Sequence, residues 1–392
     1  IALSRIFAAP VIVPKPGTDT NTVYLNGKPI QAAYLKETAA DGRPAARIVL
    51  DAASLASVYE DGSEAELDVD VEEPVVRVDL PAETVRSVLK DRSDAAFAVR
   101  TAFASYRMPL KLWVGTEGDV FTTGLAEASE AYMRKLSAET AEQGIRLTGT
   151  AADFALFADG RELTLRNAIY TERTITIDAA ALPDLTAVVW VDAEGGLHYV
   201  PSVFRDNGEH AEAAFYSPHN SMYAVIGYEA SFADLQGHWA KSDAEWLAGK
   251  LIVQGVDGDT FAPDRPVTRA EFAVMLARSL GLAESAGAAL FTDANVDAWH
   301  AGALRAAVEA GLIDGFPDGS FRPDEAVTRE QIFAMIARAI DYAGTLPSAT
   351  AAELERFADR ESLAEWARQP AERLLAAELI HGMGDTLLAP KE

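Results

Sequence analysis

Apolar residues recur with one spacing in the N-terminal part of the chain and with another in the C-terminal part. Apolar and polar residues alternate along residues 65–71 and 171–177, and a period of two is typical of a half-buried β-strand. From Trp239 onwards, apolar residues recur at helical spacing instead, for example at Trp246 and Leu251. The pattern therefore predicts mainly strands before residue 231 and helices after it.

Turns that contain glycine separate the expected strands. Asn26-Gly27 and Asp159-Gly160 each suit a two-residue hairpin turn, because such a turn needs positive φ angles. Short helices are expected between some of the strands. The expected strands are 22–25, 28–30, 46–50, 65–71, 75–81, 97–101, 104–110, 152–158, 163–165, 171–177, 187–191, 197–200, 213–216 and 222–227, and the expected helices are 52–59, 82–89 and 124–138.

These elements predict a multidomain protein. Residues 1–112 are expected to form a mixed α+β module, and residues 113–230 a mostly β module. Residues 228–231 leave only a very short linker to the C-terminal region, residues 231–392, so we expect the neighbouring parts to pack rather than swing.

A sixty-residue repeat organises the C-terminal region. Residues 263–272 recur as residues 323–332, and a weaker third copy follows. The same Gly-to-Pro spacing of eight residues joins Gly255 to Pro263, Gly315 to Pro323 and Gly382 to Pro390. Thr268 and Thr328 lie five residues after Pro263 and Pro323. The equivalent position of the third copy would be 395, past Glu392. The expected repeats are residues 231–282, 290–343 and a truncated 356–392.

Each full copy predicts a helix, a loop and a second helix that begins with a capping box. Thr268 is followed three residues later by Glu271, the spacing at which the two side chains cap a helix start reciprocally. Arg269 and Arg329 then occupy first helical positions, where the helix dipole makes a cation unfavourable. Either these arginines bind an anionic ligand beside helix N-terminal amides, or they pair with a carboxylate of a neighbouring repeat.

Several motifs in the repeats resemble the S-layer homology family. The first copy carries Phe232-Ala233-Asp234, His238-Trp239-Ala240 and Thr268-Arg269-Ala270-Glu271. The second carries Phe291-Thr292-Asp293, Trp299 and Thr328-Arg329-Glu330-Gln331, in which Gln331 replaces the last glutamate of the signature. The resemblance covers about residues 231–392. Residues 174–177, 200–201 and 220–225 of the preceding region carry a weaker resemblance, to the β-rich modules that precede S-layer homology triplets in surface proteins of Paenibacillus-like bacteria.

The resemblance implies a fold and a ligand. The family's fold is an all-α, three-lobed helical prism with ligand grooves between the lobes, and the third lobe would here be incomplete. Its implied function is non-covalent anchoring to the Gram-positive cell wall through a secondary wall polysaccharide that bears pyruvate ketals on N-acetylmannosamine. The residues expected to bind the polysaccharide or shape its grooves are Arg269, Arg329, Asp234, Asp293, Trp239, Trp299, Gly258, Gly319 and Glu271. The helical context of the tryptophans places them mostly in the core.

The amino-acid composition argues against some classes of binding partner. A net charge of −26 argues against nucleic acid and against anionic membrane surfaces. The chain has no cysteine, which suits an exported Gram-positive protein without disulfides. Its apolar runs are shorter than the roughly 18 residues of a membrane-spanning helix. Ile1–Phe7 lacks the charged start of a signal peptide, so we expect the chain to be part of a longer secreted protein.

Catalytic signatures are missing from the sequence. It contains no nucleophile elbow, P-loop, zinc-protease helix or dinucleotide fingerprint. His210 and His219 flank one loop but lack further ligands for a metal, and Glu172 with Asp178 is a weak acid pair. We therefore expect no catalysis, no cofactor and no metal. Two other functions stay open: a self-assembling S-layer subunit that contacts its own copies, and the non-catalytic C-terminal part of a secreted polysaccharide-degrading enzyme.

Overall fold

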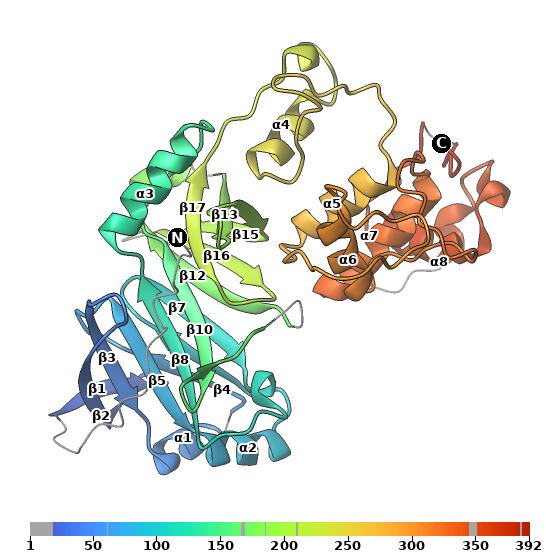
Figure 1. Cartoon of the computed structure of the whole chain (residues 1–392). Coiled ribbons are helices and arrows are strands. Elements are labelled where there is room, and N and C mark those ends of the chain that lie inside the picture. Colours follow the sequence, from blue (N-terminus) through green and yellow to red (C-terminus); the bar gives the residue numbers. More distant parts are fainter. Residues whose placement is uncertain are drawn as a thin grey trace. The chain divides into compact units, whose positions relative to one another are not determined.

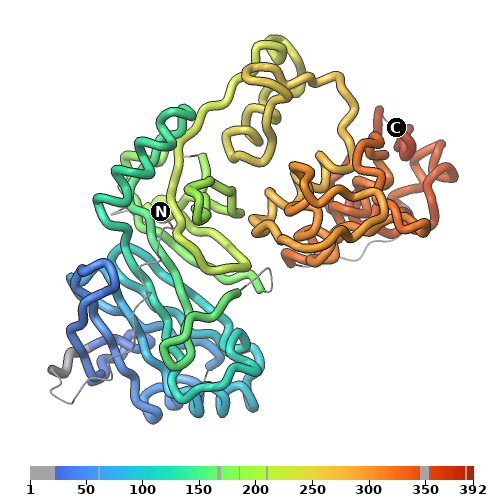
Figure 2. The backbone as a smooth tube through the Cα atoms, in the orientation of Figure 1, coloured from blue at the N-terminus to red at the C-terminus, as the bar shows by residue number. Residues whose placement is uncertain are grey.

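The chain forms two compact units in a computed structural model. The structure describes residues 19–60, 62–165, 169–184, 186–208, 211–344, 351–384 and 386–392. The first unit comprises residues up to Ala230 together with Glu245–Leu251, and the second comprises Ser231–Ala244 together with Ile252–Glu392. Figure 1 labels the elements, and Figure 2 follows the same chain as a continuous tube.

The first unit is built on strands. Within its described residues, hydrogen bonds connect 17 strands into one sheet. The strands are β1 Asp19–Leu25, β2 Lys28–Thr38, β3 Pro44–Val49, β4 Glu64–Asp68, β5 Val75–Pro81, β6 Ala96–Arg100, β7 Ala104–Pro109, β8 Val120–Glu127, β9 Arg146–Leu147, β10 Ala152–Ala158, β11 Arg161–Glu162, β12 Thr171–Ile177, β13 Ala187–Val191, β14 Leu197–Val200, β15 Ser202–Asp206, β16 Ala211–Ser217 and β17 Met222–Gly227. Three α-helices accompany them: α1 Ala52–Val58, α2 Ala82–Asp91 and α3 Glu130–Ala141.

Strands from both halves of this unit pair with one another. β8 runs antiparallel to β5 on one side and to β10 on the other, and these strands lie side by side in Figure 1. In the same way, β7 pairs with both β6 and β12. Two parallel pairs, β3 with β5 and β4 with β6, complete the mixed sheet. The backbone hydrogen bonds therefore continue across residue 112.

The expected fold class is wrong for the N-terminal region. A mixed α+β module followed by a separate, mostly β module was predicted, but one β-rich unit is found, because β8 and β7 join strands from both sequence halves. The helical pattern expected over residues 124–138 is also wrong at its start. Gly124–Glu127 belong to β8, which is almost entirely buried between its two neighbours, and α3 begins only at Glu130.

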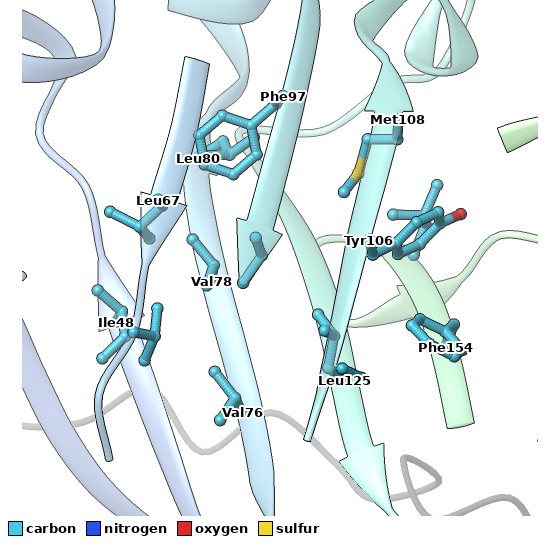
Figure 3. Close-up of a cluster of buried hydrophobic side chains, with 14 of the residues drawn as sticks. Ile48, Leu67, Val76, Val78, Leu80, Phe97, Tyr106, Met108, Leu125 and Phe154 are labelled. Carbon is cyan, nitrogen blue, oxygen red and sulfur yellow. The ribbon is translucent and has the colours of Figure 1, made fainter. Parts of the chain in front are cut away.

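The first unit's core follows the alternation of the sequence. Ile48, Leu67 and Val78 each lie on a different strand and are fully buried on the same side of the sheet region shown in Figure 3. Phe97 and Tyr106 extend this apolar layer. The predicted hairpin turns are confirmed, since Asn26 and Asp159 have φ angles of 49° and 46° and each is followed by a glycine with positive φ.

Five helices belong wholly or partly to the repeat region. They are α4 Lys241–Gly249, α5 Arg269–Ser279, α6 Ala301–Glu309, α7 Arg329–Ala343 and α8 Glu365–Ala376. One apolar cluster combines α5, α6 and part of α7, and a second combines α7 with α8 and the segments around Phe357 and Leu388. Each repeat therefore packs on the next through the second helix of the preceding copy.

The all-α, three-lobed prism is not formed. Between the helices, the described residues run as turns and extended chain, with isolated β-bridges at Asp257–Thr260 and Thr268–Ala326. The all-α expectation came from the family resemblance, whereas the sequence pattern itself predicted a loop after each first helix. Aspartate side chains, rather than helical hydrogen bonds, hold these loops in place. Those loops form part of the candidate site.

Candidate functional site

A buttressed loop occurs three times in the second unit. In each copy an aspartate near the start of the repeat accepts two hydrogen bonds from successive backbone amides of the loop that ends in the repeat's proline. Asp234 accepts from Phe261 and Ala262 at 2.9 and 2.7 Å, Asp293 from Phe321 and Arg322 at 2.8 and 2.7 Å, and Asp359 from Leu388 and Ala389 at 2.8 and 2.7 Å. We call these three structures the aspartate-held loops.

The aspartates hold a backbone conformation that side chains rarely adopt. Ala262, Arg322 and Ala389 have φ angles of 60°, 59° and 52°, in the left-handed region. Each of these residues precedes a proline. Such a conformation persists when surrounding contacts over-determine it, as the two charge-assisted hydrogen bonds do here. The Gly-to-Pro spacing therefore recurs because the three loops share one backbone geometry.

The second and third aspartate-held loops also cap the second helix of the copy before them. The Arg269 and Ala270 amides, at the start of α5, donate to the Glu325 and Pro323 carbonyls at 2.9 and 3.0 Å. At the start of α7, the Arg329 and Glu330 amides donate to the Glu392 and Pro390 carbonyls at the same distances. These amides are already paired inside the protein, so a ligand at either helix start would meet side chains and not backbone donors.

The first-turn arginines reach the same loops with their side chains. Arg269 is only 3% exposed; its Nε donates to the Phe321 carbonyl at 2.8 Å, and its guanidinium carbon lies 4.6 and 4.7 Å from the Phe316 and Phe321 ring centroids. Arg329 donates from Nε to the Leu388 carbonyl at 3.0 Å and from Nη2 to the His381 carbonyl at 2.8 Å. Both arginines therefore bind neutral acceptors of the following copy.

Neither arginine has an anionic partner. Among the described residues no carboxylate forms an ion pair with Arg269 or Arg329, although Arg322 pairs with Asp318 at 3.0 Å and Arg338 with Asp314 at 2.7 Å. Burial lowers the pKa of both first-turn guanidinium groups. Arg269 is buried and Arg329 is partly buried, and carboxylates act on them only from a distance: Glu325 and Asp293 on Arg269, and Asp359 on Arg329. An external anion beside either guanidinium would therefore be stabilised.

Glu271 is engaged in the capping box that the sequence predicted. Its Oε2 accepts from the Thr268 amide at 2.8 Å, and the Glu271 amide donates to Thr268 Oγ1 at 3.2 Å. Its other oxygen pairs with Arg265 Nη2 at 2.6 Å. In the second copy, Gln331 Oε1 accepts from the Thr328 amide at 3.2 Å, so glutamine preserves this side of the box.

The repeat tryptophans lie on the surface, and the expectation that they are mostly core is wrong. Trp239, Trp299 and Trp366 are 85%, 63% and 54% exposed. Trp239 precedes α4 and Trp299 precedes α6, so each first helix begins after its ring and buries other residues. An exposed indole offers an apolar face that can contact a ligand such as a sugar ring.

Gly258 and Gly319 occupy turns in the aspartate-held loops. Their φ angles are 24° and 81°, which favour glycine over other residues. A Cβ atom at Gly319 would lie 3.4 Å from Thr292 Cγ2, whereas none of the described atoms would lie within 4 Å of one at Gly258. Both glycines therefore fix loop shape, and only Gly319 is close to another side chain.

Residues that the sequence analysis did not select fasten the third copy to the second. Glu330 is 5% exposed, accepts from the Ala364 amide at 3.0 Å and pairs with Lys391 Nζ at 2.5 Å. Glu330 stands where the first copy has Ala270, and this difference was the only sign in the sequence that Glu330 has a role of its own. Of the two histidines considered for a metal, His210 lies outside the described residues, and His219 is buried against Tyr223.

The aspartate-held loops should make the second unit sensitive to acid. Hydrogen bonds from the Phe261 and Ala262 amides lower the pKa of Asp234. For Asp293 and Asp359, partial desolvation raises the pKa, but the amide hydrogen bonds lower it by more, so each pKa lies below its usual value. A folded-state pKa below the reference value of 3.8 stabilises the fold above that pH, and this stabilisation is lost as the pH falls through the folded-state pKa. We expect thermal unfolding of the second unit to shift downwards below about pH 4.

Calorimetry of the wild type and of Asp293→Asn between pH 7 and pH 2 checks this expectation. The variant should be less stable at pH 7 and should lose less stability on acidification, because asparagine does not titrate. Asp297→Asn, at an exposed aspartate nearby, serves as the charge-matched control. Equal pH dependence in Asp293→Asn and the wild type would contradict the role given to Asp293.

Comparison with known proteins finds a family model that matches part of the second unit. The S-layer homology domain matches residues 231–273 and 290–333, the first two copies of the repeat. These residues contain the first two aspartates of the loops, both first-turn arginines and both predicted tryptophans. The third copy follows the matched residues and shares the geometry of its aspartate-held loop with them.

Similar proteins include enzymes and surface proteins. The chain is 33% identical over 178 residues to "Amylopullulanase" of Thermoanaerobacterium thermosulfurigenes, covering 45% of this chain and 9% of that protein. It is 32% identical over 144 residues to "Cellulosome-anchoring protein" of Acetivibrio thermocellus, covering 36% and 32%. It is 30% identical over 155 residues to "Surface-layer 125 kDa protein" of Lysinibacillus sphaericus, covering 39% and 13%.

These matches cover only parts of the proteins concerned. The chain spans a third or less of the length of each of these three relatives. None of the helices in the described residues combines the length and the apolar character needed to cross a membrane.

Proposed function

We propose that this chain, which carries two S-layer homology repeats, attaches a secreted protein non-covalently to the cell wall by binding a secondary wall polysaccharide. The repeats are non-catalytic anchoring modules, and relatives that share this region include one named for cellulosome anchoring and one named as a surface-layer protein. The common property of such proteins is their place at the cell surface, and we assign this chain to the same location.

The observation that carries the proposal is the pair of unpaired arginines. Arg269 and Arg329 occupy equivalent positions, and each lacks an ion-pair partner among the described residues. A polymer that presents carboxylates, such as one bearing pyruvate ketals, would supply the missing negative charge. Because carbonyls already hold Nε of both residues, the ligand would contact the outer N–H groups of each guanidinium. Arg269 is nearly covered, so its carboxylate would approach at the guanidinium edge.

The other predicted residues would support this contact in different ways. Trp239 and Trp299 would present their exposed rings to sugar units of the polymer. Asp234 and Asp293 would act indirectly by holding the loops, as would the turn glycines Gly258 and Gly319. Glu271 would fix the start of α5 and so the position of Arg269. Residues 356–392 would act as a third copy that positions Arg329.

Removing the pyruvate groups tests the carboxylate. Wall polysaccharide that has lost its ketals to mild acid should bind at least tenfold more weakly than the untreated polymer, because each charge-assisted hydrogen bond contributes about 1.5–3 kcal/mol. Isothermal titration of both polymers against the same protein measures the ratio. A control polymer, re-neutralised without hydrolysis, should bind as the untreated polymer does. Equal affinities would remove pyruvate from the proposal and leave wall binding itself intact.

A second candidate function is that of a structural subunit of a surface layer. The relative named "Surface-layer 125 kDa protein" favours it, and the β-rich first unit would then contact other copies of the chain. Electron microscopy of the purified protein at high concentration should show ordered two-dimensional sheets if this function holds. A strictly monomeric protein in light scattering under the same conditions would count against it.

The enzyme relative "Amylopullulanase" is similar to this chain over only a small part of its own length, so we propose no reaction for this chain. "Amylopullulanase" shares the matched region, which is 9% of its length. We propose that the present residues serve such proteins as a non-catalytic attachment part. Assays of the purified chain on starch, pullulan and xylan should show no release of reducing sugar, and release above that of a heat-treated sample would overturn this assignment.

A further inference from the structure

A cavity of about 390 Å³ lies in the second repeat, apart from the two arginines. Residues 284–291 and 294–299 line it together with Ala301, Gly302, Leu304 and Arg305 of α6. Its volume falls within the range of roughly 300–1,000 Å³ that is usual for small-molecule sites. Residues 284–289 of its lining lie in the segment that joins the first copy to the second, and the other lining residues, which include Phe291 and Trp299, belong to the second copy.

Two glycines allow charged side chains to lie close against these walls. A Cβ atom at Gly302 would lie 2.6 Å from Glu284 Oε2, and one at Gly287 would lie 2.8 Å from the guanidinium carbon of Arg305. The Ser285 amide donates to the Gly302 carbonyl at 3.2 Å and so ties the joining segment to α6. The cavity is therefore a built feature, with a carboxylate and a guanidinium placed at its walls.

The lining has the chemistry of a sugar site. Trp299 contributes an indole that is 63% exposed, and its N–H has no hydrogen-bond partner in the described part of the chain. Glu284, Asn295 and Asp297 bring oxygen acceptors, and Arg305 brings donors. An aromatic ring packs on the C–H face of a pyranose, while carboxylates and amides bind its hydroxyl groups. Two lining carboxylates against one guanidinium make an anionic ligand unfavourable.

The cavity adjoins the proposed carboxylate site. Phe291 lines the cavity, and its ring stacks on the ring of Phe321 with a centroid separation of 5.2 Å. The Arg269 guanidinium carbon lies 4.7 Å from the same Phe321 ring. The Phe291 and Phe321 rings thus lie between the cavity and Arg269, so a unit in the cavity and a unit at Arg269 would lie on opposite sides of this pair of rings.

We propose that this cavity is a second subsite, which binds a neutral pyranose unit next to the carboxylate-bearing unit at Arg269. The proposal rests on the proposed function for its biological ligand, but the subsite can be tested without any charged sugar. It assigns Trp299 to the neutral unit and Arg269 to the charged one, so the two residues should respond to different probes.

The test uses the full chain and neutral monosaccharides. N-acetyl-D-glucosamine, N-acetyl-D-mannosamine and D-galactose are titrated while the indole N–H signals of the six tryptophans are followed by nuclear magnetic resonance. At least one sugar should shift the Trp299 signal, which the Trp299→Ala variant identifies. That variant should bind this sugar at least tenfold more weakly. Trp366→Ala, which removes a similarly exposed ring from the third copy, should bind it as the wild type does.

Substituting Arg269 separates this proposal from the proposed function. Arg269→Gln should keep its affinity for the neutral sugar and lose affinity for the pyruvylated polymer. If Arg269→Gln binds that polymer normally while Trp299→Ala still weakens the neutral sugar, the carboxylate site fails and the subsite stands. If no sugar of the panel shifts the Trp299 signal, or if Trp299→Ala binds as well as Trp366→Ala, the subsite is overturned.

Discussion

Replacing Arg269 and Arg329 together by glutamine should lower the affinity for pyruvylated wall polysaccharide about a hundredfold or more. Each substitution removes a cation that would bind a ligand carboxylate through hydrogen bonds of roughly 1.5–3 kcal/mol, and about 1.4 kcal/mol corresponds to a factor of ten. Glutamine retains an amide donor near the position of Nε, so it can still reach the Phe321 or Leu388 carbonyl. Isothermal titration measures the affinity, and calorimetry confirms that the variant is folded.

Arg338→Gln provides the matched control for this experiment. It removes the same charge from α7, but Arg338 already pairs with Asp314 inside the protein. The control should therefore bind the polymer within about twofold of the wild type. If the double variant is folded and binds as the control does, the two first-turn arginines serve only to fasten one repeat to the next, and the carboxylate contact must be abandoned.

Arg173→Met should destabilise the first unit by about 4 kcal/mol or more. Arg173 is fully buried in β12, and its two Nη groups donate to the carbonyls of Thr171, Ser217 and His219, to the Tyr106 hydroxyl and to Asn220 Oδ1. Methionine fills similar space but leaves these acceptors without their donor, at a cost of about 1–3 kcal/mol for each one that water cannot reach. Urea unfolding monitored by circular dichroism measures the loss.

The guanidinium shape should matter as well as its charge. Three aromatic rings surround the Arg173 guanidinium carbon, with the Tyr106 centroid at 4.4 Å, and a lysine cannot reach the same set of acceptors with a planar fork. Arg173→Lys should therefore still be clearly destabilised. Arg205→Met, at an exposed position of β15, should change stability by less than about 0.5 kcal/mol. Similar losses at positions 173 and 205 would contradict the role assigned to Arg173.

Local patterns predicted many elements of the fold well. The alternation over residues 171–177 gave β12 with its observed bounds, and the hairpin of β13 and β14 lies where its strands were expected. The same alternation places Arg173 in phase with Ile175 and Ile177, on the buried side, which was the available sign of a buried arginine. The capping box at Thr268 was also predicted, because its geometry depends on residues only three positions apart.

Contacts between distant residues account for what the sequence did not predict. β8 pairs with β5, about 45 residues earlier, and no local pattern specifies that partner. The sequence left open whether the amides at the start of α5 meet a ligand, and in the structure the carbonyls of Glu325 and Pro323, more than 50 residues later, occupy them. The Phe-x-Asp motifs were recognised as family marks, whereas their physical role appears only when each carboxylate is seen against its distant loop.

Sedimentation of the purified chain with cell-wall sacculi tests the central claim, attachment to a wall polymer, most directly. Native sacculi and sacculi stripped of their secondary polysaccharide are compared side by side with the wild type. The proposed function predicts that the protein sediments with the native sacculi and stays in solution with the stripped ones. Equal binding to both preparations, or binding to neither, would contradict attachment through that polymer.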